Sequence, residues 1–181
     1  MEGREILIGV TGGIAAYKSA ILVSRLTQAG AGVSVVMTES AQELITPRTF
    51  QALTGRPVRV KMFEAPEPFP HLTPARKADI FCIVPATANI LGKAACGIAD
   101  DLVSTLILAF SGPILFAPAM NTEMWGKPAV QRNVRQLIQD GCIFVPPQEG
   151  HLACGETGTG RMADPEKIFE KISKILSEIS D

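Results

Sequence analysis

The chain has 181 residues, of which 46% are hydrophobic and 19% are charged. This length and apolar content predict a single domain with a buried core. The 17 basic and 18 acidic residues nearly cancel, and only 6% of the residues are aromatic. This excludes a basic nucleic-acid-binding stripe and a stacking platform for bases, so we expect no nucleic acid partner. The apolar run at residues 102–110 is shorter than the ~20 residues that span a membrane, so we expect no membrane anchor.

The cysteines and the amino terminus indicate the cellular compartment. Cys82, Cys96, Cys142 and Cys154 form no CxxC pair, so neither a zinc site nor a thioredoxin-type motif is indicated. Residues 1–4 do not resemble a secretory signal peptide. We therefore expect a cytoplasmic protein with free thiols.

Short apolar runs alternate along the chain with segments of helical periodicity. Glycine and proline mark several boundaries, such as Gly30 after the first helix and Pro165 before the last. In chain order we expect a strand at 5–10, a helix at 14–28, a strand at 32–37, helical pieces at 41–44 and 47–53, a short strand at 57–60, a helix at 72–77, a strand at 80–84, a helix at 90–96, a helix capped by Asp100 or Asp101 that ends at 109, a strand at 113–117, a helix at 128–139, a strand at 142–145 and a helix at 165–179.

Strands that are apolar throughout and alternate with helices predict an α/β fold, with a parallel sheet covered on both faces. Ligands of such sheets bind beyond the carboxyl ends of the strands. Polar or glycine-rich loops fall at four of these ends, at residues 11–14, 38–40, 85–89 and 118–121. We therefore expect these four loops to form a ligand site.

The first two loops leave the class of ligand open. The turn at residues 9–13 (GVTGG) is not a GxGxxG motif, but it has space for a phosphate near the start of a helix. Glu39 stands where a dinucleotide enzyme holds a ribose. The hydroxyls of Thr38 and Ser40 suit a phosphate monoester better, although Ser40 is equally well explained as the cap of the next helix.

The other two loops carry small residues, hydroxyls and amides. In residues 85–89 (PATAN), small side chains let the backbone approach a flat ring, and Asn89 is either a ligand contact or a helix cap. Met120 and Trp125 are explained equally well as core residues. Asn121 directly follows a strand, so its amide is expected to face the cleft.

The glycine-rich segment at residues 150–162 carries both Cys154 and Arg161. Glycines permit close backbone approach to a ligand, and arginine supplies a fixed, forked positive charge. This pattern predicts a mobile loop with a reactive thiol. A free cysteine is also commonly a small buried hydrophobe, so both interpretations of Cys154 stay open here.

Three segments together resemble a known family. Residues 118–125 (PAMNTEMW) resemble the PxMNxxMW motif of the homo-oligomeric flavin-containing cysteine decarboxylases. Residues 85–89 resemble that family's PASANT motif, with Thr87 where serine is common and Ile90 where threonine is common. Residues 150–162 resemble the substrate clamp of the phosphopantothenoylcysteine decarboxylases within it. The resemblance covers nearly the whole chain and implies a Rossmann-like (flavodoxin-like) three-layer sandwich.

The resemblance also implies FMN as the cofactor, without a metal. The implied catalytic residues are His71 as general base, Asn121 as carboxylate-binding amide and Cys154 as proton donor, with Pro70 and Pro74 departing from the family pattern around His71. The implied FMN contacts are Gly12, Gly13, Ile14, Thr38, Ser40, Thr87, Ala88, Asn89 and Ala119. The implied substrate contacts are Asn121, Ala153, Arg161 and Met162, and His151 is a further candidate.

The implied reaction converts 4'-phosphopantothenoylcysteine to 4'-phosphopantetheine and CO2 in coenzyme A biosynthesis. FMN would take a hydride as the CH2–SH group becomes a thioaldehyde, and CO2 would leave to give an enethiol. The reduced FMN would then return the hydride to the enethiol, with the proton from Cys154. A peptidyl-cysteine decarboxylase, which stops at the enethiol, a flavin prenyltransferase and a regulatory flavoprotein subunit without activity remain as alternatives. We expect one domain over residues 1–181, with a clamp at about 148–163 and no ligase domain, that assembles as a homotrimer or dodecamer.

Overall fold

A five-stranded parallel sheet forms the centre of the molecule. The computed structural model describes residues 1–62, 72–152, 155 and 157–179. Its strands run in the order β2-β1-β3-β4-β5, a flavodoxin-like order. They are β1 (Glu5–Val10), β2 (Gly32–Met37), β3 (Ile80–Ala86), β4 (Ile114–Pro118) and β5 (Ile143–Phe144). The predicted fold class is confirmed.

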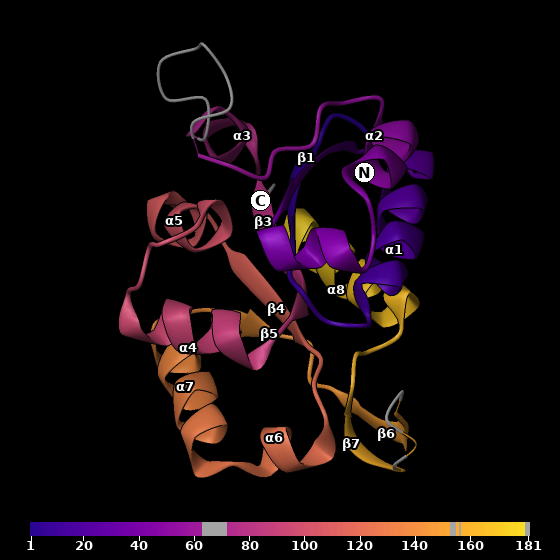
Figure 1. Cartoon of the computed structure of the whole chain (residues 1–181). Coiled ribbons are helices and arrows are strands. Elements are labelled where there is room, and N and C mark those ends of the chain that lie inside the picture. The colour runs from indigo at the N-terminus through magenta and orange to yellow at the C-terminus, as the bar shows by residue number, and fades with distance from the viewer. Residues whose placement is uncertain (63–71, 153–154, 156, 180–181) are drawn as a thin grey trace.

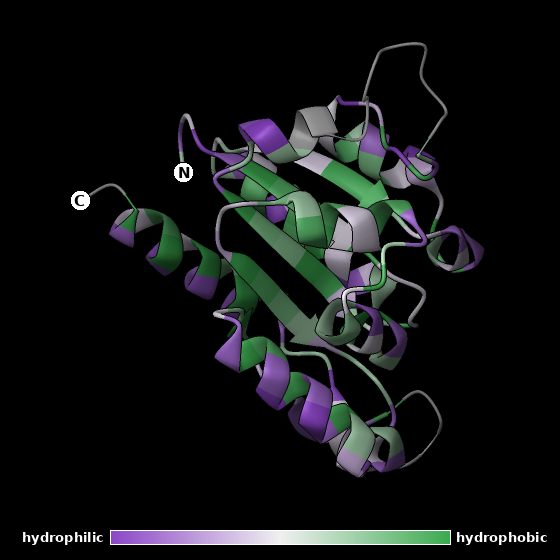
Figure 2. Ribbon diagram, turned by 90° about the vertical axis from the view of Figure 1, so that its left-hand side faces the viewer, coloured by the Kyte–Doolittle hydropathy of each residue, from purple (hydrophilic) through white to green (hydrophobic). Residues whose placement is uncertain are grey.

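Helices cover both faces of this sheet (Figure 1). One face carries α1 (Ala16–Gln28), α2 (Pro47–Thr54) and α8 (Pro165–Glu178). The other carries α3 (Leu72–Lys77), α4 (Ala88–Cys96), α5 (Leu102–Ala109) and α7 (Pro128–Gln139). Along β1, Ile6 and Ile8 pack into the core on the first face and Leu7 into the core on the second, as expected for a strand buried on both sides. Figure 2 shows the apolar sheet between helices whose polar sides face outward.

A capping box decides where α5 begins. Asp101 Oδ1 accepts a hydrogen bond from the Ser104 backbone N–H (2.8 Å), and Ser104 Oγ accepts one from the Asp101 N–H (3.1 Å). Of the two predicted caps, Asp100 and Asp101, the latter is therefore correct, and such a cap contributes about 1 kcal/mol. No helix in the described part of the chain is both long and apolar enough to cross a bilayer.

Several predicted boundaries are wrong. The segment at 57–60 forms no strand and contributes one isolated bridge, between Val36 and Arg59. The helical piece predicted at 41–44 is a 3-10 helix, η1 (Glu39–Glu43). β5 has two residues instead of the four predicted at 142–145.

Two helix starts also differ from the prediction. α1 begins at Ala16 instead of residue 14, because the glycine turn extends further than expected. β3 continues through Ala86, and α4 begins at Ala88 because Thr87 is its N-cap. The short helix α6 (Thr122–Gly126) was not predicted, since five residues are too few to show helical periodicity.

The glycine-rich segment forms a β-hairpin that the sequence did not predict. Its strands, β6 (Gln148–His151) and β7 (Thr157–Arg161), pair antiparallel as a second sheet. Glycine, threonine and glutamine in these strands give no apolar alternation, so the strand signal is absent. β7 packs against α6 (Figure 1), which brings the predicted clamp next to the loop that follows β4.

Candidate functional site

A pocket of about 840 Å³ opens at the carboxyl ends of β1, β2, β3 and β4, the position where ligands bind to open parallel sheets. The loops that follow these strands and the hairpin β6–β7 line it. Every predicted site residue that the structure describes lies in its wall: Gly12, Gly13, Ile14, Thr38, Ser40, Thr87, Ala88, Asn89, Ala119, Asn121, Arg161 and Met162. His151 lines it as well. His71, Ala153 and Cys154 lie outside the described residues.

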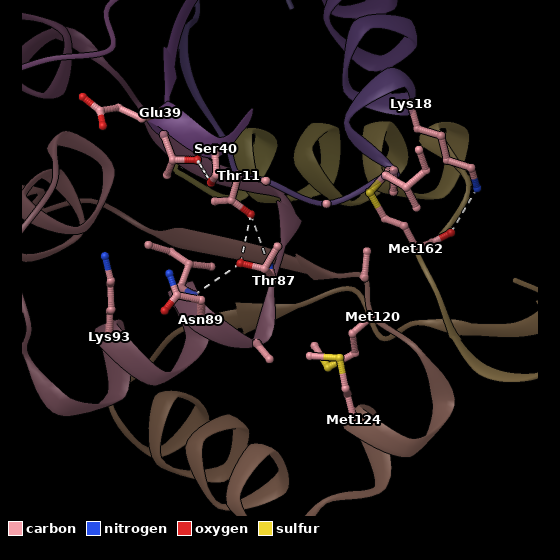
Figure 3. Close-up of a pocket in the computed structure, with 18 of the residues that line it drawn as sticks. Thr11, Lys18, Glu39, Ser40, Thr87, Asn89, Lys93, Met120, Met124 and Met162 are labelled. Atoms are coloured by element: carbon pink, nitrogen blue, oxygen red, sulfur yellow. Dashed lines mark hydrogen bonds between the residues drawn. The ribbon is translucent and has the colours of Figure 1, made fainter. Parts of the chain in front are cut away.

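One buried hydroxyl joins the loops after β1 and β3. Thr11 is 1% exposed, and its Oγ1 donates to the Pro85 carbonyl (2.7 Å). The same oxygen accepts from the Thr87 backbone N–H (3.2 Å) and lies 3.3 Å from Thr87 Oγ1. Figure 3 shows Thr11 and Thr87 facing each other in the pocket wall. These bonds fix the two loops relative to each other across the point where the strand order reverses.

The glycine turn lies between two neighbouring loops. A Cβ on Gly12 would overlap Ser40 Oγ, and a Cβ on Gly13 would lie 3.3 Å from Thr87 Cγ2. The turn can therefore approach the two loops this closely because Gly12 and Gly13 have no side chain. α1 begins just beyond them, and its N-cap residue Ala15 makes no side-chain capping bond. The Ala16 and Lys18 N–H groups donate to the Gly13 and Ala15 carbonyls, so this terminus favours an anionic ligand through the helix dipole.

The loop after β2 presents two hydroxyls to the pocket. Thr38 Oγ1 and Ser40 Oγ lie 3.1 Å apart and both line the cavity. The alternative interpretation of Ser40 as a helix cap is wrong, because Thr38 is the N-cap of η1 and no side chain caps it. The Glu39 carboxylate points away from Ser40 and Thr11 (Figure 3).

The loop after β3 ends at Thr87, the N-cap of α4. Its Oγ1 accepts from the Ile90 N–H (3.4 Å) and so caps α4. The alternative interpretation of Asn89 as the cap is therefore wrong, and Asn89 lies in the first turn of α4 with an exposed side chain at the pocket. Ile90, which replaces a threonine of the family motif, is 1% exposed and packs into the core beneath the pocket.

The loop after β4 places Asn121 at the start of α6. Asn121 Oδ1 accepts from the Met124 N–H (2.8 Å), so the side chain caps this helix. Within the described residues its Nδ2 has no hydrogen-bond partner and remains available as a donor to a ligand. Met120 and Trp125 both pack partly against the core, as one interpretation of the sequence had it. Met120 also lines the pocket, where its side chain lies next to that of Met124 (Figure 3).

Lys93 and Lys18, two of the charged side chains in the pocket wall, form ion pairs. Lys93 Nζ lies 2.6 Å from Asp100 Oδ1 and 2.7 Å from Asp101 Oδ2. Burial opposes the charge of Lys93, but the two hydrogen bonds outweigh burial and raise its pKa. The hydrogen bond from Lys93 lowers the pKa of Asp100, so Lys93 and Asp100 stay charged over the physiological pH range. Lys18, whose side chain is 9% exposed, pairs with Asp164 at 3.3 Å.

Sequence reasoning missed several residues of the pocket wall. Thr11 stands in the predicted ligand loop at residues 11–14, but no role of its own was predicted for it. Lys18 and Lys93 stand inside helices, and only the packing of these helices shows that they face the pocket. Tyr17 also lines it, without a sequence signal that would have distinguished it from a surface residue. Asp101, Met124 and Leu152 line it as well; they stand at the predicted cap, in the family motif and in the glycine-rich segment.

Comparison with known proteins agrees with this geometry. The Flavoprotein family model matches residues 1–177, nearly the whole chain. The chain belongs to the Flavoprotein family. The earlier resemblance to flavin-containing proteins is thereby confirmed.

Individual relatives of this flavoprotein are similar along its whole length. The coenzyme A biosynthesis bifunctional protein CoaBC of Bacillus subtilis (strain 168) is 47% identical over 180 residues, which cover 98% of this chain and 44% of that protein. The chain thus spans about half the length of the curated relatives it matches. A PPC decarboxylase variant in complex with pantothenoylaminoethenethiol superposes with a TM-score of 0.86 at 30% identity, over 96% of this chain and 98% of that one. The FMN-dependent cysteine decarboxylase SpaF superposes with a TM-score of 0.86 at 36% identity, over 99% and 98%.

The pocket of this flavoprotein fits a phosphorylated flavin. The backbone of Gly12 packs so closely on Ser40 that a Cβ would overlap it. The start of α1, which no side chain caps, lies next to Gly12 and suits a phosphate. The hydroxyls of Thr38 and Ser40 add donors on the same side. Ala88 and Ala119 line another part of the pocket with small apolar side chains, which suits a flat ring system.

We expect Thr11→Val to loosen the pocket, because the substitution keeps the shape of the side chain but removes its hydroxyl. The Pro85 carbonyl and the Thr87 N–H then lose a buried partner, which lowers the free energy of unfolding by about 1–3 kcal/mol. Flavin retention falls as well, since the two loops are no longer joined. Urea denaturation and flavin absorbance of the purified protein measure both effects.

Thr27→Val is the matched control. Thr27 Oγ1 donates only to the Val23 carbonyl within α1 (2.9 Å), away from the pocket. Equal stability and equal flavin content of the two variants would contradict the role given to Thr11.

Proposed function

We propose that this chain is an FMN-dependent decarboxylase that converts 4'-phosphopantothenoylcysteine to 4'-phosphopantetheine and CO2 in coenzyme A biosynthesis. The observation that carries this proposal is one pocket that joins the flavin-binding loops to Asn121 and to the hairpin residues Arg161 and Met162. Similarity to a PPC decarboxylase over nearly all of both chains supports it. We assign this activity to residues 1–181 as one domain and place it in the cytoplasm, where free thiols persist.

The loops after β1, β2 and β3 would hold FMN. Gly12, Gly13 and Ile14 with Thr38 and Ser40 would hold its phosphate side, and the segment 87–89 with Ala119 would hold the rest. When bound, FMN supplies the acceptor and donor of the hydride that makes this decarboxylation possible. The protein contributes binding, orientation and proton transfer around it.

Asn121 is placed to bind the substrate carboxylate. Its Oδ1 is committed to the Met124 N–H, which fixes the side-chain orientation and leaves Nδ2 as a donor toward the pocket. A neutral amide suits this role because it binds the carboxylate without the strong ion pair of an arginine, so CO2 can leave. A hydrogen bond from the neutral amide thus positions the carboxylate without strongly stabilising its charged form.

Proton transfers are assigned to His71 and Cys154. In this proposal His71 removes a proton in the oxidative half of the reaction, and the Cys154 thiol donates one in the reductive half. Along the chain, residues 60–62 of the pocket wall precede His71, and the hairpin strands flank Cys154. The hairpin covers the pocket from the side of α6 and would exclude water from the reacting carbon.

The decisive experiment supplies 4'-phosphopantothenoylcysteine to the FMN-loaded protein and identifies the product by mass. We expect 4'-phosphopantetheine from the wild type, and CO2 with the unreduced enethiol product from Cys154→Ser. His71→Asn is expected to retain FMN and release no CO2. Release of CO2 from a peptide with a carboxy-terminal cysteine, but not from 4'-phosphopantothenoylcysteine, would contradict the proposal and favour a peptidyl-cysteine decarboxylase.

Asn121→Asp separates helix capping from substrate binding. The aspartate oxygen still accepts from the Met124 N–H, so the melting temperature should stay close to that of the wild type. The new negative charge repels the substrate carboxylate, and we expect kcat/KM to fall about 100-fold or more. Asn121→Ala, which loses the cap as well, should additionally lower stability by about 1 kcal/mol. Wild-type kinetics of Asn121→Asp would remove this residue from the mechanism.

We further propose that the chain assembles as a homotrimer or a dodecamer. Ile14, Tyr17 and Ile21 are 63%, 57% and 52% exposed. Tyr17 and Ile21 are four residues apart and lie on one side of α1, and Ile14 lies in the turn just before it. Ile14 and Tyr17 also line the pocket, so a second copy seated on this stripe would close the site.

Substitution of Ile21 tests this assembly, because Ile21 lies on the stripe but outside the pocket wall. Ile21→Lys should lower the molar mass measured by light scattering, since a charge replaces apolar contact area. Ile179→Lys, at the exposed end of α8 (47% exposed), should leave it unchanged. A monomeric wild type, or loss of assembly in Ile179→Lys alone, would overturn the proposed interface.

A further inference from the structure

The carboxylate of Asp164 lies where the hairpin meets α8 and contacts residues from three other elements. Its Oδ1 accepts from Lys18 Nζ on α1 and from Arg161 Nη2 at the end of β7, both at 3.3 Å. In the amide orientation that satisfies both of its groups, Gln148 at the start of β6 donates to Asp164 Oδ2 (3.3 Å) and accepts from Lys167 Nζ (3.1 Å). One side chain therefore joins both ends of the hairpin to α1.

Asp164 is not used as a helix cap, although it occupies the N-cap position of α8. Aspartate is favoured there because its carboxylate accepts hydrogen bonds from the first N–H groups of the helix. Here no side-chain capping bond is formed. The carboxylate points instead toward the hairpin and α1, so helix formation does not explain its contacts.

Lys18 is the most buried of these partners. Its side chain is 9% exposed, compared with 43% for Arg161, so the contact with Lys18 is screened far less by solvent. Lys18 Nζ also donates to the Met162 carbonyl (3.2 Å), a contact visible in Figure 3. Because Lys18 and Met162 both line the pocket, this group connects the start of α1 directly to the end of the hairpin.

The opposite side of the hairpin is held by close backbone packing. The Met120 N–H donates to the Gly160 carbonyl (3.0 Å). A Cβ on Gly160 would overlap the Met120 carbonyl, and one on Gly158 would overlap Thr122. β7 is therefore fixed on the segment that carries Asn121, and Asp164 holds the hairpin on the side of α1.

We propose that Asp164 is a positioning residue that holds the hairpin β6–β7 over the pocket through Lys18, Arg161 and Gln148. It acts through these residues and does not touch the reacting atoms. Its position sets where Arg161 and Met162 stand in the pocket wall. The consequence for catalysis rests on the proposed function, whereas the consequence for the hairpin does not.

Hydrogen–deuterium exchange on the FMN-loaded and the FMN-free protein tests the positioning itself. In Asp164→Asn we expect the amides of residues 148–151 and 157–162 to exchange about tenfold faster, as for loss of a charged hydrogen bond. The amides of β1 and β3 should keep their wild-type rates. Glu166→Gln is the matched control, because it removes a carboxylate from the same turn of α8 that pairs with Arg25 (2.6 Å), outside the pocket. Asp164→Glu should restore slow exchange.

Unchanged exchange in the hairpin of Asp164→Asn would overturn the proposal, and so would an equal increase throughout the sheet. If the unpaired charge of Lys18 prevents folding of this variant, Lys18→Met/Asp164→Asn removes that charge and should fold with a fast-exchanging hairpin. Failure of both variants to fold would assign Asp164 a general structural role and overturn the proposal as well.

Product analysis with 4'-phosphopantothenoylcysteine gives the catalytic readout. We expect Asp164→Asn to raise KM and to increase the share of unreduced enethiol product several-fold, while Glu166→Gln matches the wild type. Loss of overall stability alone would not change this ratio of products. A wild type that releases no CO2 would refute the proposed function and leave the exchange result intact.

Discussion

The crevice between β1 and β3 is the constraint on which the rest of the site depends. The chain leaves β1 toward one face of the sheet through α1, and leaves β3 toward the other face through α4. The two loops must therefore diverge, and the opening between them can hold a ligand. The Thr11 hydroxyl bridges this opening at its base. The neighbouring strands all end at the same edge of the sheet. The loops and helix starts that follow them therefore line the opening.

The pocket wall combines closely packed backbone with charged side chains. Glycines at residues 12 and 13 allow the loops after β1, β2 and β3 to approach each other closely. The uncapped start of α1 supplies positive potential without a titratable group. Lysines near the pocket are neutralised by carboxylates, Lys93 by Asp100 and Asp101 and Lys18 by Asp164. The site can therefore attract an anionic cofactor through the start of α1.

The hairpin extends this site beyond the sheet. Its strand β7 lies against the segment that carries Asn121, and Gly158 and Gly160 permit this contact because neither has a Cβ. A segment interpreted from its glycines as a mobile loop is thus, in its described strands, a paired and docked structure. Glycine in this hairpin serves close packing as much as backbone freedom.

The sequence by itself determined the α/β class, the four ligand loops and the residues that line them, because apolar runs and strand ends are encoded locally. Its motifs also identified the flavoprotein family. Only the tertiary structure showed that Ser40 and Asn89 are not helix caps and that Asn121 is one, since capping depends on the neighbouring backbone. It also placed Lys18 and Asp164, which are 146 residues apart in the sequence, within hydrogen-bond distance of each other. Local periodicity carries no information on such pairs, because their distance is fixed by how α1, the hairpin and α8 pack together.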